Sequence, residues 1–214
     1  MERLICVLIG YVCGLFQTGY IYGKIHHIDI RKHGSGNAGT TNALRTLGWK
    51  AGAITFLGDF LKCIVAVGIV YLIYGKTHQS MFELLAMYTG MGAVLGHNFP
   101  FYLNFKGGKG IATTAGLLIA VNPKVALIAM ATFIVVVAIT RFVSLGSIIL
   151  VVIFAIGMIF QGEFSGTTLV GTELYELYGL SIFLAAMAIY RHRANIKRLL
   201  NGTENKLSFG KRKE

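Results

Sequence analysis

The sequence has few charged residues, and acids are the scarcest of them. Only 14% of its 214 residues are charged, with nine Asp and Glu against 20 Lys and Arg. About a quarter of the residues of a soluble domain are charged, so these numbers exclude an ordinary soluble enzyme. Disorder is excluded as well, because 55% of the residues are hydrophobic and disordered chains lack such residues. The composition therefore predicts a membrane protein.

Cysteine is also scarce, with three residues in the chain. Cys6, Cys13 and Cys63 lie in apolar stretches without CxxC spacing, which argues against a disulfide framework and against a metal site. We expect them to be small buried hydrophobic side chains. The net charge of +11 predicts no nucleic-acid partner, since basic residues of membrane proteins gather on the cytoplasmic side and bind anionic lipids or substrates.

Long apolar segments run through the whole chain. A membrane-spanning helix needs about 20 residues, with about 17 as the lower limit. Six segments satisfy this limit, and one is short. The seven segments are residues 4–23, 52–74, 81–99, 110–122, 124–140, 143–160 and 174–190.

Positive charge predicts the orientation of these segments. Residues 24–51 and 191–214 are strongly basic, so both should lie in the cytoplasm. An even number of crossings must separate them, which requires the short segment 110–122 to cross as well. We therefore predict an all-α membrane protein with seven transmembrane helices, one short, with the N-terminus outside and the C-terminus cytoplasmic. Residues 1–206 form a single helical membrane domain, and residues 207–214 form a basic C-terminal tail.

Glycine spacing predicts close helix packing. Three GxxxG patterns occur within the predicted helices, and such patterns let two backbones approach closely. We interpret these glycines as packing residues. They are Gly10 and Gly14, Gly19 and Gly23, and Gly92 and Gly96.

A glycine-rich polar segment, residues 34–45, lies on the predicted cytoplasmic side. It begins with a GxGxxG pattern but lacks the preceding strand of a dinucleotide-binding unit, which disfavours that function. Its glycines expose backbone N–H groups. Thr41 or Asn42 can cap a helix that runs toward Arg45, and the N-terminus of that helix would favour an anion. A polar capping loop without a ligand is the alternative.

A second segment, Lys106-Gly107-Gly108-Lys109-Gly110, leads directly into an apolar helix. It is not a Walker A sequence, because Lys109 is followed by Gly and not by Ser or Thr. Glycines interleaved with two lysines are typical of a backbone nest for a phosphate, and we expect the glycines to lend N–H groups. A plain interfacial turn is the alternative.

A third segment, residues 191–198, continues the last apolar helix. His192 and Asn195 share one helix face at i, i+3, as do Arg191 and Arg198 at i, i+7. An amphipathic basic extension on anionic lipid accounts for the arginines but does not require His192 and Asn195.

Three ionisable residues fall within the predicted helices: Asp59, Lys62 and His97. Intramembrane ionisable groups indicate function by default. For Asp59 and Lys62, at i, i+3, a structural ion pair is the favoured interpretation. His97 lies near the cytoplasmic end of its helix and can face the same site, although a histidine satisfied within the bundle is an equal alternative.

Basic groups, glycine loops and Ser, Asn and His donors thus meet at one membrane boundary with almost no acids. This combination predicts binding of phosphorylated or otherwise anionic substrates beside lipid. It disfavours metal-dependent phosphotransfer, which needs carboxylates for Mg²⁺. No His-x4-Asp sequence occurs, so a His–Asp-activated hydroxyl of the acyl-CoA-dependent type has no candidate.

Three motifs in order resemble the bacterial acyl-phosphate:glycerol-3-phosphate acyltransferases, an integral membrane family. The resemblance covers about residues 4–206 and departs from the family pattern at Cys63, where Gly is expected. The motifs are Ser35-Gly36-Asn37-Ala38-Gly39-Thr40-Thr41-Asn42 with Arg45, Gly96-His97 leading to Phe105-Lys106-Gly107-Gly108-Lys109-Gly110, and His192-x-x-Asn195-Ile196-x-Arg198 with Glu204.

The resemblance implies transfer of a fatty acyl group from acyl phosphate to the 1-hydroxyl of sn-glycerol 3-phosphate. The products are lysophosphatidic acid and phosphate, at the first step of phospholipid synthesis. It implies a multi-pass protein of the bacterial plasma membrane whose active site faces the cytoplasm, without a metal or cofactor. Its partners are the two substrates and membrane lipid, and a soluble acyl-phosphate-forming enzyme is a further candidate.

The same resemblance carries roles onto residues of this chain. Ser35, Arg45, His192 and Asn195 are the expected catalytic residues, and whether Ser35 or His192 acts as a base or acyl carrier stays open beside direct transfer. The competing function is transport of a small phosphate ester, which is disfavoured because transporters carry such sites near the midplane within repeated, broken helices. The expected substrate-binding residues are Asn37, Thr41, His97, Lys106, Gly107, Gly108, Lys109 and Gly110.

Overall fold

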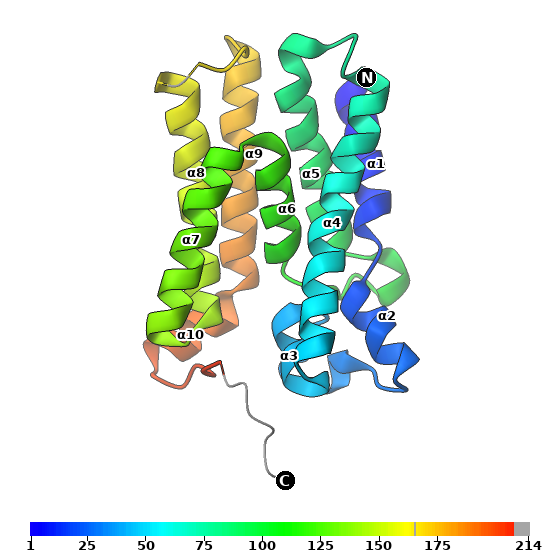
Figure 1. Ribbon diagram of the computed structural model, residues 1–214, viewed down its shortest axis with the longest axis vertical. Helices are drawn as coiled ribbons and strands as arrows, with labels where there is room; N and C mark the ends of the chain where they lie inside the picture. The colour runs from blue at the N-terminus through cyan, green and yellow to red at the C-terminus, as the bar shows by residue number, and fades with distance from the viewer. Residues whose placement is uncertain (165, 208–214) are drawn as a thin grey trace.

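The computed structural model describes residues 1–164 and 166–207, which contain helices and no strand. Most of the chain lies in long helices that run side by side (Figure 1). This confirms the all-α prediction. The helices are α1 (Glu2–Gly14), α2 (Thr18–Ile25), α3 (Thr40–Leu47), α4 (Trp49–Tyr74), α5 (Phe82–Asn98), α6 (Ile111–Val121), α7 (Pro123–Thr140), α8 (Val143–Phe164), α9 (Thr172–Arg191) and α10 (Arg193–Leu200).

The long helices form two halves around a short central helix. α1, α4 and α5 make one half, and α7, α8 and α9 make the other, with α6 between α4 and α7 (Figure 1). The short helices α3 and α10 lie at the same end of the molecule (Figure 1). Because α6 has only 11 residues, it does not fill the space between the halves at that end.

Five helical elements are long and apolar enough to cross a membrane: α1 with α2, α4, α7, α8 and α9. α5 has 17 residues, at the lower limit for a crossing. Apolar side chains face outward along these helices, among them Leu61 and Leu72 on α4 and Ile128 on α7. The protein therefore spans a membrane several times. The count of seven crossings and their orientation remain predictions.

The apolar segment predicted over residues 4–23 is a candidate membrane span over Glu2–Ile25, but it is not one continuous helix, since α1 ends at Gly14 and α2 begins at Thr18. The physical reason is Gln17, whose side chain is buried at the break. Its Nε2 donates to the carbonyl oxygens of Gly14 at 3.3 Å and of His97 at 3.0 Å. The side-chain amide thus binds carbonyls that a continuous helix would not present to it.

The predicted glycine packing is confirmed between α1 and α5. A Cβ on Gly10 would lie 1.9 Å from the carbonyl oxygen of Thr89, and one on Gly92 would lie 2.2 Å from that of Val7. Distances this short leave no room for any side chain. The two backbones are therefore in direct contact, and we call this interface the α1–α5 seam.

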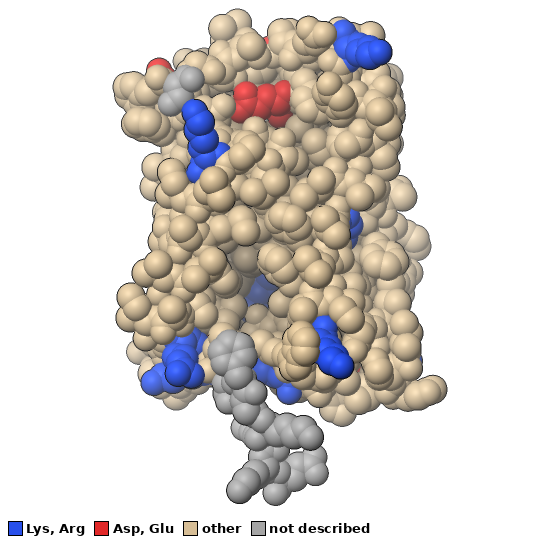
Figure 2. Space-filling model, viewed as in Figure 1, with Lys and Arg blue, Asp and Glu red and all other residues tan. Residues whose placement is uncertain are grey.

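The charged side chains differ between the two ends of the molecule. On the face in Figure 2, basic side chains lie at both ends, and the acidic side chains in view lie near the end opposite α3 and α10. Between the halves the surface is hollowed, with a basic side chain visible inside (Figure 2). Of the predicted tail 207–214, residues 208–214 lie outside the described residues.

Candidate active site

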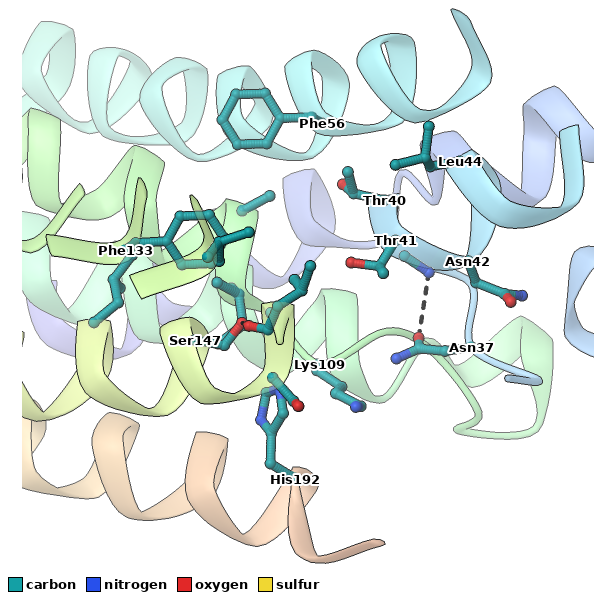
Figure 3. A pocket seen from close by; sticks show the side chains of 18 of the residues that line it. Asn37, Thr40, Thr41, Asn42, Leu44, Phe56, Lys109, Phe133, Ser147 and His192 are labelled. Atoms are coloured by element: carbon teal, nitrogen blue, oxygen red, sulfur yellow. Dashed lines mark hydrogen bonds between the residues drawn. The ribbon is translucent and has the colours of Figure 1, made fainter. Parts of the chain in front are cut away.

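A cavity of about 360 Å³ lies between the two halves, next to α3 and α10. Helices α3 to α8 and α10 contribute to its wall, and Figure 3 shows the lining side chains from close by. One part of the wall is polar and basic, and the other is apolar. Within the described residues, no three His, Cys, Asp or Glu side chains are grouped so that they could hold a metal ion.

Nine of the twelve predicted site residues line this cavity. They come from the three sequence segments that were singled out and from α5, which are far apart along the chain. The structure brings together Ser35, Asn37, Thr41, Arg45, His97, Lys109, Gly110, His192 and Asn195.

The glycine-rich loop before α3 is organised by Asn42. Its Oδ1 accepts from the backbone N–H of Ser35 at 2.8 Å, and its Nδ2 donates to the carbonyl of Ile30 at 2.7 Å. Gly34, at φ +59°, has no room for a Cβ, which would lie 2.3 Å from Asn42 Oδ1. Asn42 therefore holds the loop in shape and does not cap the helix.

The first turn of α3 forms part of the cavity wall. The helix begins at Thr40, before the predicted caps Thr41 and Asn42, and no side chain in the described part of the chain caps it. Asn37 instead accepts from the backbone N–H of Gly39 at 3.2 Å (Figure 3). Thr40 and Thr41 both line the cavity, so the first N–H groups of α3 lie at a position that favours an anion.

Arg45 is half-buried, and within residues 1–164 and 166–207 no carboxylate forms an ion pair with it. Its Nη2 donates to the backbone carbonyl of Asn205 at 3.2 Å. Burial lowers the pKa of the Arg45 guanidinium below its usual value, yet an arginine remains charged at any physiological pH. The cavity wall therefore carries a positive charge that an anionic ligand can neutralise.

Lys109 is linked to Glu204 through Asn195. Lys109 Nζ donates to Asn195 Oδ1 at 2.5 Å, and Asn195 Nδ2 donates to Glu204 Oε1 at 2.8 Å. Glu204 also accepts from Ser144 at 3.1 Å and from Arg198 at 2.7 Å. These bonds fix the Asn195 amide with its oxygen toward the lysine. Burial lowers the pKa of Lys109 to about 8, so it is cationic at neutral pH.

His192 follows α9 and is buried against the polar wall. Its Nδ1 lies 2.7 Å from the carbonyl oxygen of Ala188. A carbonyl only accepts, so Nδ1 carries the proton and Nε2 is left as an acceptor. Burial lowers the pKa of His192 to about 4, which keeps the ring neutral at physiological pH.

Lys106, Gly107 and Gly108 do not line the cavity. The backbone N–H groups of Gly107 and Gly108 donate to the carbonyls of Asn98 and His97, both at 3.1 Å. The expectation that these two glycines lend N–H groups to a phosphate is therefore corrected, because the protein already uses them. Lys106 is exposed.

Sequence reasoning missed most of the apolar wall and two serines. Ser144 and Ser147 on α8 line the cavity, as does Glu204, and none of the three was among the expected site residues. The apolar wall has no motif, since its side chains look like any lipid-facing residue. It includes Phe56 on α4, Met130, Phe133, Ile134 and Val137 on α7, and Leu150 on α8.

Comparisons with known proteins give relatives that share one description. The family model described as glycerol-3-phosphate acyltransferase matches residues 4–202. A glycerol-3-phosphate acyltransferase of Clostridioides difficile (strain 630) is 46% identical over 99% of this chain and 97% of its own length. A protein of the same name from Thermoanaerobacter sp. (strain X514) is 43% identical over 97% of this chain and 96% of its own.

Two solved structures share the fold. Both are crystal structures of PlsY (YgiH), described as an integral membrane glycerol 3-phosphate acyltransferase. The glycerol 3-phosphate form has a TM-score of 0.82 at 34% identity and covers 97% of this chain and 96% of that one. The lysophosphatidic acid form has a TM-score of 0.80 at 33% identity and covers 98% and 97%.

Proposed function

This chain belongs to the glycerol-3-phosphate acyltransferase family, and from that membership we propose that it transfers a fatty acyl group from an acyl phosphate to the 1-hydroxyl of sn-glycerol 3-phosphate. The protein is an integral membrane acyltransferase. The names of its relatives support glycerol 3-phosphate as the acceptor. The acyl phosphate donor and the residue roles below are our proposal.

One observation carries this proposal: a single cavity has basic groups at one wall and apolar side chains at the other. The reaction needs this combination, because its donor is a long hydrocarbon chain that ends in a phosphate. Apolar side chains such as Phe56, Phe133 and Leu150 suit the acyl chain. Arg45 and Lys109 suit phosphates, since charge-assisted hydrogen bonds to phosphate are among the strong ones.

Two phosphates must be bound close together, and the cavity has two basic groups for them. Arg45 lies on α3, whose N-terminus with Thr41 also favours an anion. Lys109 lies with Asn195 on the opposite part of the polar wall. We assign one phosphate to Arg45 and the other to Lys109. Gly110, which has no side chain, leaves room for the phosphate beside Lys109. The exposed Lys106 attracts the anionic substrates toward the site.

The attacking hydroxyl is oriented by acceptors and not by a strong base. His192 Nε2 accepts a hydrogen bond from the 1-hydroxyl, and Ser35 and Asn37 hold neighbouring oxygens. The hydroxyl oxygen forms the new ester bond at the carbonyl carbon, the bond from that carbon to the bridging oxygen breaks, and the released phosphate takes the hydroxyl proton. Because an acyl phosphate is a mixed anhydride, positioning and charge stabilisation account for most of the rate.

The proposal also includes the location of the protein and the orientation of its site in the membrane. Basic residues accumulate around α3 and α10, which supports a cytoplasmic site in the plasma membrane of a bacterium, with seven crossings. Lysophosphatidic acid then enters the same membrane, and no diffusible cofactor is needed. A soluble enzyme that forms acyl phosphate would deliver its product to this basic face.

The test is release of inorganic phosphate by the purified protein in detergent. Palmitoyl phosphate is supplied with and without glycerol 3-phosphate, to wild type, Ser35→Ala and Arg45→Ala. The exposed Arg193 gives a matched control, Arg193→Ala. We expect release only with both substrates, lost in the two cavity variants and kept in the control. Release without glycerol 3-phosphate would indicate an acyl-enzyme, and binding of glycerol 3-phosphate without any release would indicate a transporter.

A further inference from the structure

A buried polar cluster borders the cavity between α4 and α5. It consists of Asp59 and Lys62 on α4 and His97 on α5, whose exposed fractions are 1%, 7% and 3%. Asp59 and His97 line the cavity, whereas Lys62 does not. Buried ions in a membrane protein need a partner, and an ion pair alone would satisfy that need. The cluster holds a third group, the imidazole of His97.

Lys62 makes three contacts through its single nitrogen. Nζ donates to Asp59 Oδ1 at 2.9 Å and to the carbonyl oxygen of Phe16 at 2.7 Å, and it lies 2.8 Å from His97 Nδ1. The two oxygens can only accept hydrogen bonds. An ammonium has three N–H donors, so it satisfies both oxygens and donates its third proton to His97 Nδ1.

This donation determines the tautomer of His97. A neutral imidazole has one donor and one acceptor nitrogen, and the hydrogen bond at one nitrogen sets the state of the other. With Nδ1 as acceptor, the proton lies on Nε2. Thr18 Oγ1, which donates to Asp59 Oδ1 at 3.3 Å, keeps that carboxylate as an acceptor. Within residues 1–164 and 166–207, no group forms a hydrogen bond with His97 Nε2.

We propose that Lys62 is a positioning residue that holds His97 as the Nε2–H tautomer, so that His97 donates a hydrogen bond to a phosphate oxygen of a substrate in the cavity. The identity of that substrate rests on the proposed function. The donor itself can be tested with inorganic phosphate alone.

The imidazole edge of His97 packs against Gly108. A Cβ on Gly108 would lie 2.0 Å from Nε2, so only glycine leaves room for the ring at this position. Lys109, the next residue, lines the cavity together with His97. The proposal places one phosphate in this shared cavity, where it accepts hydrogen bonds from the imidazole and from the ammonium group.

The break between α1 and α2 takes part in this arrangement. Phe16, which supplies one acceptor for Lys62, lies within the break. Gln17, also in the break, donates to the carbonyl oxygen of His97 at 3.0 Å. The irregular segment thus contacts both Lys62, which sets the tautomer, and His97, whose tautomer is set. A continuous helix would provide neither contact.

The first experiment measures the tautomer directly. Full-length protein labelled with ¹⁵N at histidine is studied by solid-state NMR in lipid, and His97 is assigned by the loss of its signals in His97→Gln. We expect a protonated Nε2, an unprotonated Nδ1, and a shift confined to Nε2 when inorganic phosphate is added. A protonated Nδ1, or no response of Nε2 to phosphate, would overturn the proposal. This readout needs no activity, so it fails independently of the proposed function.

The second experiment changes the partner of Nδ1. In Lys62→Met the carboxylate of Asp59 remains as an acceptor, so we expect the proton to move from Nε2 to Nδ1. Asp59→Asn with Lys62→Met restores an N–H donor to Nδ1 and removes the unpaired buried charge, so this double variant should regain the Nε2–H state. Retention of the Nε2 proton in Lys62→Met, or its loss in the double variant, would contradict the role of Lys62.

Kinetics then identifies the substrate that receives this hydrogen bond. We expect Lys62→Met to raise the KM for one of the two phosphorylated substrates about tenfold, the size expected for one hydrogen bond to a charged group, and the double variant to reverse the increase. A rise for glycerol 3-phosphate assigns His97 to the acceptor, and a rise for palmitoyl phosphate assigns it to the donor. A purely structural role would lower the yield of folded protein and leave both KM values unchanged.

Discussion

The α1–α5 seam and the cavity both depend on glycine, but the seam uses its lack of a side chain, whereas the loops beside the cavity also use its positive φ. In the seam, Gly10 and Gly92 let two backbones touch, and any side chain would collide with a carbonyl. Beside the cavity, Gly34 and Gly110 adopt positive φ values of +59° and +82°, which shape loops around an open space. In the seam, the glycines allow close packing of two helices. In the cavity, the loops hold the cationic side chains of Arg45 and Lys109. One region therefore supplies stability and the other supplies binding.

This difference predicts the largest effect for a substitution in the seam. Gly92→Ala adds a Cβ about 2.2 Å from the carbonyl oxygen of Val7, and the overpacking should cost about 3 kcal/mol of unfolding free energy. The melting temperature in detergent should then fall by roughly 6–12 °C. Gly68→Ala is the matched control, because nothing lies within 4 Å of its Cβ position. Equal melting temperatures would show that the seam does not carry the stability.

The next largest effect concerns the cavity and leaves stability alone. Arg45→Ala removes a cation that binds only a carbonyl within the described residues. We expect kcat/KM to fall roughly 10²- to 10³-fold, as for loss of one preorganised charge stabiliser, with the melting temperature unchanged. Parallel measurements on the exposed Arg193→Ala should match wild type. A large loss of stability in Arg45→Ala would erase the contrast between the two regions.

A third prediction separates the two walls of the cavity. Phe133→Ala shortens the apolar wall on α7, and losing part of a buried aromatic contact should raise the KM for palmitoyl phosphate about tenfold. The KM for glycerol 3-phosphate should not change, because its binding groups lie on the polar wall. Leu127→Ala, on the outward side of the same helix, is the control. Equal changes in both KM values would mean that the walls do not bind different parts of the substrates.

The smallest expected effect is a pH dependence from Lys109. Its pKa of about 8 means that it is cationic below this pH and loses its charge as the pH rises through it. The KM for the phosphate that it binds should therefore increase about fourfold between pH 7 and pH 8.5, from the change in the charged fraction alone. Lys109→Arg should flatten this increase, since arginine stays charged. An unchanged slope in Lys109→Arg would assign the titration to another group.

Much of the fold could be predicted from the sequence because apolar length and glycine spacing are local signals. The predicted segments 124–140 and 143–160 correspond to α7 and the main part of α8. The break at Gln17 could not be predicted, because it depends on carbonyls of α5 that are about eighty residues away. A side chain that binds a distant backbone leaves no pattern near itself.

The site divides in the same way. Arg45, Lys109 and His192 carry charge or unusual chemistry in polar segments, and the structure brings them to one cavity. The role of Gly107 could not be predicted, since its N–H group was expected to face a ligand and instead donates to the carbonyl of Asn98 on α5. Phe133 had no signal, because a cavity-lining aromatic and a lipid-facing one are the same residue type in the same kind of helix.

The choice of acyl donor tests the central claim most directly. Lysophosphatidic acid formation from glycerol 3-phosphate is measured with the purified protein and either palmitoyl phosphate or palmitoyl-CoA as the sole donor. The account predicts product with palmitoyl phosphate, none with palmitoyl-CoA, and loss of that product in Arg45→Ala. Product formation from palmitoyl-CoA, or from palmitoyl phosphate in Arg45→Ala at the wild-type rate, would contradict a cavity that binds the donor through its phosphate.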